Sequence, residues 1–417
     1  MMEEKRKVPK IRFPEYTDEW EQCKLDNILT ERHVLSKISD EYPRLSFTIE
    51  EGVIDPEDRK TNKRDFLMKD EANKKFLLTE IGDIIYNPAN VVFGAIHRNS
   101  YRKGCLSPIY RIFETNQESR FLECVVRSET FISKLAQKTE GSVVKLKTLK
   151  PEAFLGMNVY VSSSLGEQKE IAAFFEKLDN LITLYQRRCE YIKIYKKYLI
   201  QKMFPQNGKK MPEIRFPGFT DGWEQRKLGD QMYIKSRIGW QALTRNEYLE
   251  TGDYYLITGT DIDEGSHTVD LKRCYYVSKE RYEMDDKIQV REGDIIVTKD
   301  GTIGKVAMVT GLDKPATLNS HLFVLRDLSG NLDNRYLLQM LNSHIFDTFV
   351  NSTRTGSTLT GLPQKTFVEF QFPVPRYEEQ KQISGFFDNL DNLITLHQRQ
   401  YEKYKKLKAG LLQNMFV

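Results

Sequence analysis

Large hydrophobic side chains recur at steps of four and three residues in two long stretches of the chain, residues 163–204 and 376–417. Such steps place the side chains along one seam of a helix, which is the heptad pattern of a coiled coil. The seam positions are Ile171, Phe175, Leu178, Ile182, Ile192 and Leu199 in the first stretch and Ile383, Phe387, Leu390, Ile394, Tyr404 and Leu411 in the second. The pattern therefore predicts two long helices that share one frame.

The two stretches are copies of each other. "LDNLITL" stands at residues 178–184 and again at 390–396, and "EQK" precedes it in both stretches. A second repeat, "IRFPEYTDEWEQCKL" at 11–25 and "IRFPGFTDGWEQRKL" at 214–228, opens each half. Internal self-similarity of this kind indicates that one structural unit occurs twice. The chain is thus two copies of an opening segment, a variable body and a closing helix.

Two seams of equal length favour pairing of the helices with each other, although packing of each helix on its own body alone remains the alternative. Residues 205–212, rich in proline, glycine and lysine, end the first helix and lead into the second body, so the paired helices are expected to be antiparallel. Lys196 and Lys408 interrupt both seams at the same position. A seam lysine fixes the register of a helix pair, opens the pair locally or extends into solvent near the helix end, and the sequence leaves these readings open.

The bodies share short β-branched runs and glycine-bearing turns, such as "GDII" at 82–85 and 293–296, which are typical of strands joined by turns. We therefore predict an α+β fold, in which two similar heads are separated by a long antiparallel two-helix coiled coil with pseudo-two-fold internal duplication. The predicted domains are a first head at 1–162, a first helix at 163–204, a linker at 205–212, a second head at 213–375 and a second helix at 376–417.

Composition limits the possible partners and location of the protein but does not identify its function. Lys and Arg total 63 against 59 Asp and Glu, and the net charge of +4 permits a polyanionic partner without requiring one. The five cysteines form no C-x-x-C pair, and no signal peptide is recognisable, so we expect a reducing, cytoplasmic location. No apolar run approaches the length of a membrane span, and no membrane association is expected.

The chain contains fragments that resemble catalytic motifs but completes none of them. Asn87-Pro88-Ala89-Asn90 lacks the second proline and the aromatic residue of an amino-methyltransferase motif. "GTIGKV" at 301–306 lacks the spacing of a phosphate-binding loop, and the histidines show no metal-ligand spacing. The sequence therefore predicts no catalytic residues, no metal and no cofactor in this chain.

Basic and polar loops are the remaining candidates for a functional surface. Lysine and arginine contact phosphates or guanine edges, and asparagine reads adenine. The candidate DNA-binding residues are Lys60, Lys63, Arg64, Asn87, Asn90, Arg98, Arg102 and Lys103 in the first body and Lys299, Asp300, Thr302, Lys305 and Arg354 in the second. Ordinary solvated loops are the alternative for each of them. The turns around Asn87 and Lys299 are favoured because they occupy aligned positions in the two bodies.

The duplicated "EQK.I..FF..LDNLITL" helices, the duplicated openings that end in "WEQ.KL" and the two variable bodies resemble the specificity (S) subunit of Type I restriction-modification systems. The resemblance covers essentially the full length. It implies that each body is a target recognition domain that reads one half of a bipartite, interrupted site in double-stranded DNA. It also implies that the paired helices set the unread spacer and dock two modification subunits.

The same resemblance implies a division of labour within a restriction system. The modification subunits would carry S-adenosylmethionine and the methylating residues, and restriction or motor subunits would complete the complex, so this chain is expected to be a non-catalytic, DNA-binding subunit. Two other classes of function remain: a protein-binding scaffold whose coiled coil spaces two heads, and an enzyme that acts alone on DNA.

Overall fold

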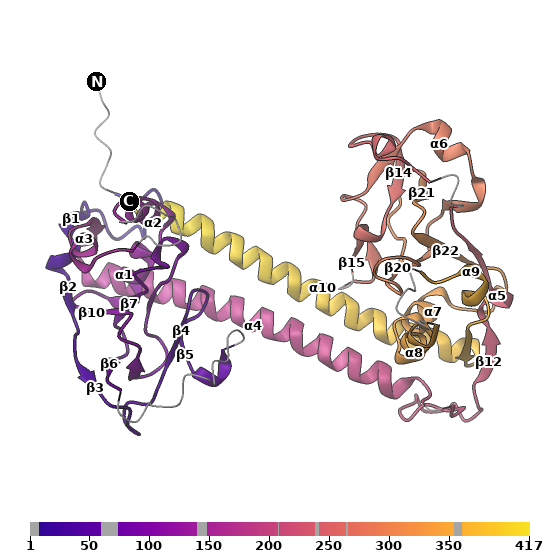
Figure 1. The fold of residues 1–417 in the computed structure, drawn as a ribbon, viewed down its shortest axis with the longest axis horizontal. Coiled ribbons are helices and arrows are strands. Elements are labelled where there is room, and N and C mark those ends of the chain that lie inside the picture. The colour runs from indigo at the N-terminus through magenta and orange to yellow at the C-terminus, as the bar shows by residue number, and fades with distance from the viewer. Residues whose placement is uncertain are drawn as a thin grey trace. The chain divides into compact units, whose positions relative to one another are not determined.

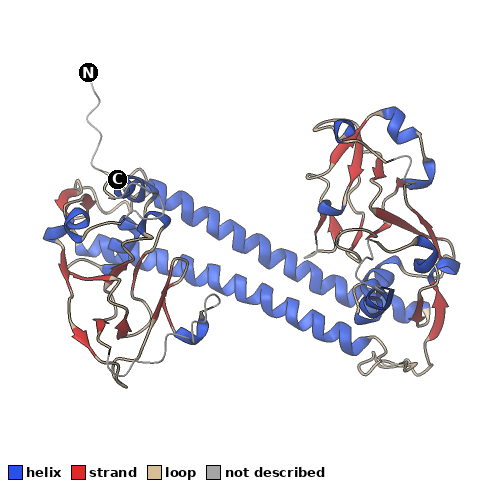
Figure 2. Cartoon of the chain, viewed as in Figure 1, coloured by secondary structure: helices blue, strands red, loops and turns tan. Residues whose placement is uncertain are grey.

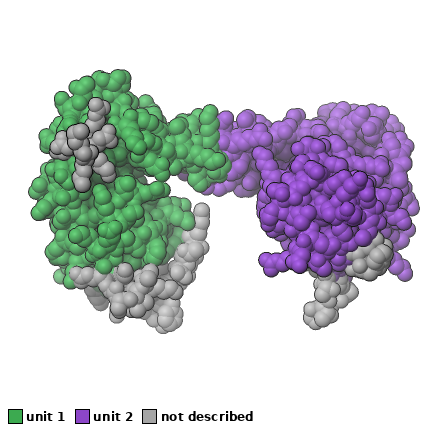
Figure 3. All heavy atoms as spheres, turned by 90° about the horizontal axis from the view of Figure 1, so that it is seen from above, with its two compact units in different colours: residues 1–183, 401–417 green, residues 184–400 purple. Residues whose placement is uncertain are grey.

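The computed structural model describes residues 8–59, 74–139, 148–206, 208–237, 242–263, 266–353 and 361–417. It mixes helices and strands throughout (Figure 2), so the predicted α+β class is confirmed. The chain divides into two compact units, residues 1–183 with 401–417 and residues 184–400 (Figure 3). The division passes through both long helices, and each unit therefore contains one body, the beginning of one long helix and the end of the other.

The first unit is built on short antiparallel strands. Its strands are β1 (Glu21–Lys24), β2 (Leu29–Glu31), β3 (Leu35–Ser36), β4 (Ser46–Thr48), β5 (Gly52–Ile54), β6 (Phe76–Thr79), β7 (Ile84–Tyr86), β8 (Ile96–Arg98), β9 (Gly104–Leu106), β10 (Arg111–Thr115) and β11 (Asn158–Val161). Its helices are α1 (Ser119–Val126), α2 (Glu129–Ala136), α3 (Pro151–Leu155), the first part of α4 (Leu165–Met203) and the last part of α10 (Tyr377–Asn414), with 3-10 turns η1 (Leu25–Asn27), η2 (Pro56–Asp58) and η4 (Val91–Phe93). The strands form one four-stranded sheet, β2-β10-β7-β8, one three-stranded sheet, β3-β6-β9, and two strand pairs. Figure 1 shows the short helices α1, α2 and α3 close together in this unit.

The sheets of the second unit contain more strands than those of the first. Its strands are β12 (Glu224–Lys227), β13 (Met232–Lys235), β14 (Tyr254–Ile257), β15 (Ile262–Asp263), β16 (Thr268–Val269), β17 (Tyr275–Val277), β18 (Gln289–Val290), β19 (Ile295–Thr298), β20 (Val306–Met308), β21 (Ala316–Leu318), β22 (Leu322–Asp327) and β23 (Gln371–Val374). Its short helices are α5 (Leu228–Gln231), α6 (Lys279–Glu283), α7 (Asn334–Leu341), α8 (His344–Thr353) and α9 (Gln364–Phe367), with 3-10 turns η7 (Arg245–Glu247), η8 (Gly259–Asp261) and η9 (Asp286–Ile288). The strands form a six-stranded sheet, a four-stranded sheet and one pair.

The bodies share one skeleton. The strand order β2-β10-β7-β8 of the first unit recurs as β13-β22-β19-β20 in the second, where β16 and β15 extend it. The pair β1·β11 recurs as β12·β23, and the eight-residue helices α1 and α7 follow the matching strands β10 and β22. The remaining sheet differs between the two units. The four-stranded sheet of the second unit includes a parallel pair, β14·β21, whereas the three-stranded sheet of the first unit is wholly antiparallel.

The repeated Gly-Asp signal has a local cause. Gly82 (φ +97°) and Gly293 (φ +82°) adopt left-handed conformations in the turn before β7 and β19, which glycine tolerates without strain. The next residue closes the turn: a carboxylate oxygen of Asp83 accepts from the backbone N–H of Glu80 (2.7 Å), and Asp294 accepts likewise from Arg291 (2.8 Å). The pattern therefore marks the same buried strand in both bodies.

Both long helices contribute to the core of each unit. In the second unit, Phe204 at the end of α4 packs beside Trp223, Tyr336 and Phe387 of the opening segment, α7 and the start of α10. In the first unit, Phe416 packs in the same way beside Trp20, Phe121 and Phe175. Each body is thus closed by the end of the helix that began in the other copy.

Candidate nucleic-acid interface

The seam lysines form ion pairs between the two long helices. In the second unit, Nζ of Lys196 lies 2.7 and 2.8 Å from the carboxylate oxygens of Asp391, and only 5% of Lys196 is exposed. In the first unit, Nζ of Lys408 lies 2.5 Å from Oδ1 of Asp179. Asp179 and Asp391 are the aspartates of the two "LDNLITL" repeats, so each repeat receives the seam lysine of the other helix. Lys196 therefore does not extend into solvent.

These two contacts define an antiparallel register inside each unit, as the sequence predicted. A third contact agrees with it, since Sγ of Cys189 lies 3.9 Å from the carbonyl oxygen of Ile394 in the second unit. Burial raises the pKa of Asp391 and the positive charge of Lys196 opposes that shift. A buried ion pair of this kind penalises any register that leaves one charge alone.

The predicted seam residues lie in these helix contacts and in the cores of the bodies. The buried ones are Ile171, Phe175, Leu178, Leu199, Ile383, Phe387 and Ile394, and the partly buried ones are Ile182, Ile192, Leu390, Tyr404 and Leu411. The first unit's core includes side chains from α4 and α10 together, as does the second unit's. The alternative in which each helix packs only on its own body is therefore excluded.

The "EQK" motif joins each long helix to its opening segment. Arg12 makes two hydrogen bonds to the buried carboxylate of Glu167 (2.5 and 2.9 Å), and Arg215 makes the same pair to Glu379 (2.7 and 2.8 Å). Burial opposes ionisation of Glu167, but the hydrogen bond from Arg12 holds its pKa below the ordinary value. The motif is therefore a structural clamp.

The glutamine of the motif reaches the neighbouring short helix. Oε1 of Gln168 accepts from the backbone N–H of Glu118 (3.0 Å), the N-cap of α1, and Oε1 of Gln380 accepts from that of Asp333 (2.9 Å), the N-cap of α7. Thus α4 holds the N-terminus of α1, and α10 holds the N-terminus of α7.

Asn87 and Asn90 lie together at a hollow in the surface of the first unit. The hollow has a volume of about 340 Å³ and is lined by the β4–β5 hairpin, the turn after β7 and neighbouring side chains, including Ile49, Glu50, Arg59, Asn87, Asn90 and Tyr110. Oδ1 of Asn87 accepts from the backbone N–H of Ala89 (3.0 Å), which fixes the turn. Amide, carboxylate and guanidinium groups at one hollow are the groups that distinguish base edges.

The hairpin and its acidic tip were missed in the sequence. "SFTIEEGVI" at 46–54 is a strand, a turn and a strand, and the glycine before the second strand was the available signal. Gly52 has a φ of +72°, and a Cβ there would lie 2.8 Å from Cβ of His97. The close approach of hairpin and β8 therefore requires glycine.

The other first-body candidates are dispersed. Arg102 and Lys103 are about half exposed and form surface ion pairs with Asp55 (2.8 Å) and Glu41 (2.6 Å), which are weak enough to exchange for phosphates. Arg98 points instead toward the buried Glu123, with its Nε 3.9 Å from the carboxylate. Lys60, Lys63 and Arg64 lie outside the described residues.

Glu123 is the centre of a buried charge network in α1 and β8. Its carboxylate lies 2.6 Å from Arg120 and 3.4 Å from Arg127, and 3.6 Å from Nδ1 of His97. Nε2 of His97 lies 2.7 Å from the carbonyl oxygen of Ile49 at the hairpin tip. Burial opposes ionisation of Glu123, yet hydrogen bonding to His97 and the two arginine charges lower its pKa below the ordinary value.

Acid is expected to weaken the first unit through Glu123. Because its folded-state pKa is below the ordinary 4.5, the carboxylate stabilises the fold at neutral pH, and that contribution is lost as the pH falls from about 4.5 downward. Glu123→Gln is expected to lower the free energy of unfolding at pH 7 by roughly 1–3 kcal/mol and to flatten its decline in acid. Urea unfolding at a series of pH values measures both, and an unchanged acid dependence would contradict this role.

The second-body candidates gather on one turn between β19 and β20. Lys299 reaches Oγ of Ser236 (3.2 Å), and Asp300 lies 3.3 Å from Nδ1 of His321. The carbonyl of Thr302 and the N–H of Lys305 both bond to the hydroxyl of Thr298, which closes the turn. Arg354 lies outside the described residues.

The turns of the two bodies are structurally equivalent. Each follows the central strand of the shared sheet, β7 or β19. Each also accepts a backbone hydrogen bond from a later segment, from Leu149 to the carbonyl of Pro88 (3.1 Å) and from Leu362 to that of Lys299 (2.6 Å). The same scaffold therefore presents Asn-Pro-Ala-Asn in one body and Thr-Lys-Asp-Gly in the other.

Neither a metal cluster nor a membrane span is found in the described part of the chain. No group of three or more His, Cys, Asp or Glu side chains there is placed to hold a metal ion. No helix among those residues is long and apolar enough to cross a bilayer.

Known proteins share this organisation. Residues 220–406 match the family described as the Type I restriction modification DNA specificity domain. The Type I restriction enzyme MjaVIII specificity subunit of Methanocaldococcus jannaschii is 22% identical over 256 residues, which are 60% of this chain and 59% of that protein. The putative MjaX specificity subunit of the same organism is 27% identical over 226 residues, 52% of this chain and 50% of that one. The chain thus spans between half and three fifths of the length of these curated relatives.

Solved structures resemble the whole chain. The crystal structure of the Type I restriction-modification S subunit from M. genitalium matches with a TM-score of 0.63 and 13% identity, over 98% of this chain and 99% of that one. A chain from a structure of complex assembly and conformational transition of the type I R-M system matches with a TM-score of 0.52 and 15% identity, over 95% and 97%. The matched domain fills most of the second copy and its helix motif recurs in the first, so the chain is similar in sequence to Type I restriction-modification specificity subunits and similar in fold to the solved S subunit.

Proposed function

We propose that the chain is the DNA-reading subunit of a Type I restriction-modification complex, in which each body reads one half of a bipartite, interrupted site. The observation that carries this proposal is the pair of equivalent turns on a common sheet. Their framework is repeated, while the residues that they carry, Asn87 to Asn90 in one and Thr298 to Gly301 in the other, differ completely. A repeated scaffold with unlike reading residues fits recognition of two unlike half-sites.

The chemistry of the turns fits base recognition. Asparagine pairs in a bidentate way with adenine, and lysine donates to the acceptors of guanine. A turn held by backbone hydrogen bonds at both ends loses little conformational entropy when it enters a groove. Arg102 and Lys103, which precede β9 and pair with Asp55 and Glu41, would contact phosphates and set the orientation of the first body.

The likeness to Type I specificity subunits supports a proposal for the wider complex. In the proposal, this chain performs no catalysis, and two modification subunits that bind S-adenosylmethionine dock on the long helices and methylate adenine. Restriction or motor subunits complete the complex, which acts on DNA in the cytoplasm. The antiparallel helix contacts support a docking surface that is repeated in both units, as two copies of one partner require.

Removing the reading groups of one turn is expected to affect one half-site only. Asn87→Ala with Asn90→Ala should relax the base preference of one half of the methylated sequence, at a cost of about 1–3 kcal/mol in discrimination. Lys299→Ala with Thr302→Ala should do so for the other half. Base-resolution mapping of methylation in a host that carries the modification subunits and each variant measures the effect.

The control is Lys24→Ala, which removes an exposed lysine of β1, a strand that does not line the hollow. It should leave both half-sites unchanged. If either turn variant relaxed both half-sites together, the two bodies would not read separately. If the complex bound no duplex at all, a scaffold that binds proteins would be the better reading.

A further inference from the structure

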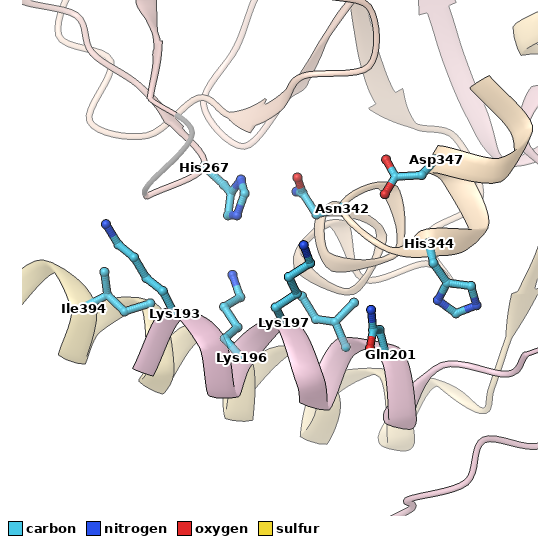
Figure 4. Close-up of a pocket in the computed structure, with 10 residues that line it drawn as sticks. Lys193, Lys196, Lys197, Gln201, His267, Asn342, His344, Asp347 and Ile394 are labelled. Atoms are coloured by element: carbon cyan, nitrogen blue, oxygen red, sulfur yellow. The ribbon is translucent and has the colours of Figure 1, made fainter. Parts of the chain in front are cut away.

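A second hollow lies in the second unit, between α4 and the body. Its volume is about 450 Å³, within the range of small-molecule sites. One wall is the face of α4 that carries Lys193, Lys196, Lys197 and Gln201, and the opposite wall includes His267 and the start of α8 (Figure 4). We call it the α4 pocket. None of the DNA-binding candidates lines it.

The lining of the α4 pocket is predominantly cationic. Lys196 is neutralised by Asp391, but Lys193 and Lys197, one helical turn apart, form no salt bridge with any described residue. His267 faces these lysines across the pocket (Figure 4). Asp347 is the single carboxylate of the lining, and burial raises its pKa. The charges of His344 and Lys197 oppose that shift. Two ammonium groups against one carboxylate leave the pocket with an excess of positive charge.

The backbone of His267 is hydrogen-bonded through both its N–H and its carbonyl group. His267 has a φ of +52° and is the one non-glycine residue with a positive φ among the described residues. Its backbone N–H donates to the carbonyl of Asp263 (2.8 Å), and its carbonyl accepts from the N–H of Met308 (2.9 Å). A left-handed backbone conformation costs about 1 kcal/mol or more for a residue other than glycine. Residues that keep such a strained conformation are often found in binding loops.

His344 adds an unsatisfied polar group. It begins α8 and lines the α4 pocket beside Gln201 (Figure 4). Its Nδ1 is buried and has no hydrogen-bond partner among the described residues. A buried nitrogen without a partner is costly, and a ligand that hydrogen-bonds to it would remove that cost.

The duplication provides an internal comparison. At the matching positions of the first unit, Lys197 is replaced by Ala409 and His344 by Glu129. Nε2 of Gln413, the counterpart of Gln201, lies 3.4 Å from the carboxylate of Glu129. Lys405 and Lys408 stand at the positions of Lys193 and Lys196, and the clamps and helix ion pairs are also retained in both units. Lys197 and His344 are therefore the parts of the lining that distinguish the second unit.

The lining also defines the chemical class of ligand. Lysine is a compact point charge that suits phosphate, and imidazole and amide groups can add hydrogen bonds. Ile200 and Ile394 supply apolar wall, and the volume exceeds that of a phosphate group. The ligand class is therefore a phosphate with an attached organic part.

We propose that the α4 pocket binds the phosphate of a nucleotide, either free in solution or within a DNA strand. Lys193 and Lys197 bind the phosphate through their charges, and His267 and His344 add hydrogen bonds. Ile200 and Ile394 contact the sugar. This site is distinct from the two turns, and the inference does not depend on their reading bases.

The experiment uses the full chain and two probes, AMP for a free nucleotide and a fluorescent DNA duplex for a strand. Lys193→Ala with Lys197→Ala removes two exposed charges, and circular dichroism verifies that the fold is kept. The matched control, Lys405→Ala with Lys406→Ala, removes two exposed lysines from the corresponding turn of α10. Calorimetry measures AMP binding, and anisotropy over a range of salt concentrations measures duplex binding.

If a free nucleotide is the ligand, AMP binds and the Lys193/Lys197 variant binds it at least about tenfold more weakly, while the control does not. If a strand is the ligand, the variant reduces the salt slope of duplex binding by about 1–2 and leaves the methylated sequence unchanged. The proposal is overturned if AMP does not bind and the duplex slope is unchanged. It is equally overturned if the control weakens binding as much as the variant.

Discussion

Replacing Lys196 with alanine is expected to lower the free energy of unfolding of the second unit by about 3–5 kcal/mol. The substitution leaves the carboxylate of Asp391, whose side chain is 16% exposed, without the cation that lies 2.7 Å away. Gln339, 3.4 Å from the same carboxylate, carries no charge to replace it. Urea unfolding followed by circular dichroism measures the loss.

The control for this result is Lys196→Met with Asp391→Leu. Replacement of both partners by apolar side chains of similar size removes the lone charge and is expected to restore most of the stability. Without the ion pair, shifted registers of the two helices are no longer penalised, so the double variant should populate them. Disulfide crosslinking of engineered cysteine pairs along α4 and α10 would detect these shifted registers. A loss below about 1 kcal/mol in Lys196→Ala would mean that the pair behaves as a surface contact.

Removal of the Phe204 ring is expected to have a comparable effect, about 3–5 kcal/mol, because the ring is fully buried and a cavity remains. Its centroid lies 6.1 Å from that of Trp223 and 6.3 Å from that of Phe387. Phe204→Ala should therefore loosen the second unit, and hydrogen exchange should show lost protection in α7 and the start of α10.

Phe416 provides the matched comparison. It is the counterpart of Phe204 at the end of α10 but is only partly buried, so Phe416→Ala should cost less. Its effect should appear in the first unit, around Trp20 and Phe121, and not in the second. Loss of protection in the wrong unit in either variant would contradict the closure of each body by the other copy's helix.

The long helices were predictable because their signal is local. Side chains at steps of three and four residues, from Ile171 to Leu199 and from Ile383 to Leu411, define a helical seam without knowledge of any other contact. The repeat supplied the second half of the argument, since equal seams suggested a pair. The structure agrees with both inferences and gives α4 and α10 as Leu165–Met203 and Tyr377–Asn414.

The candidate interface was predictable only in part. Asn87 and Asn90 are three residues apart on one turn, so their proximity at the hollow follows from the chain itself. Arg98 is close in sequence to Arg102 and Lys103 but points to Glu123 on α1, a contact that depends on how the helix packs on β8. Glu50 and Arg59 reach the hollow from another hairpin and another turn. Residue type indicates what a side chain can bind, and packing decides which side chains meet.

By itself, the sequence determined the duplication, the two long helices with their hydrophobic seams, the mixed α+β character of the bodies and the lack of a recognisable catalytic motif. These features are accessible because periodicity, repeats and motifs depend only on the order of residues along the chain. The tertiary structure alone decided the partners of charges far apart in the chain. Asp179 meets Lys408 across 229 positions and Lys196 meets Asp391 across 195, and both pairs exist only when the helices lie antiparallel in one register. The same folding gathers Lys197 and His344 at one pocket in the second unit, and the residues at the matching positions of the first unit are Ala409 and Glu129. Such groupings depend on distances in space, which residue order does not encode.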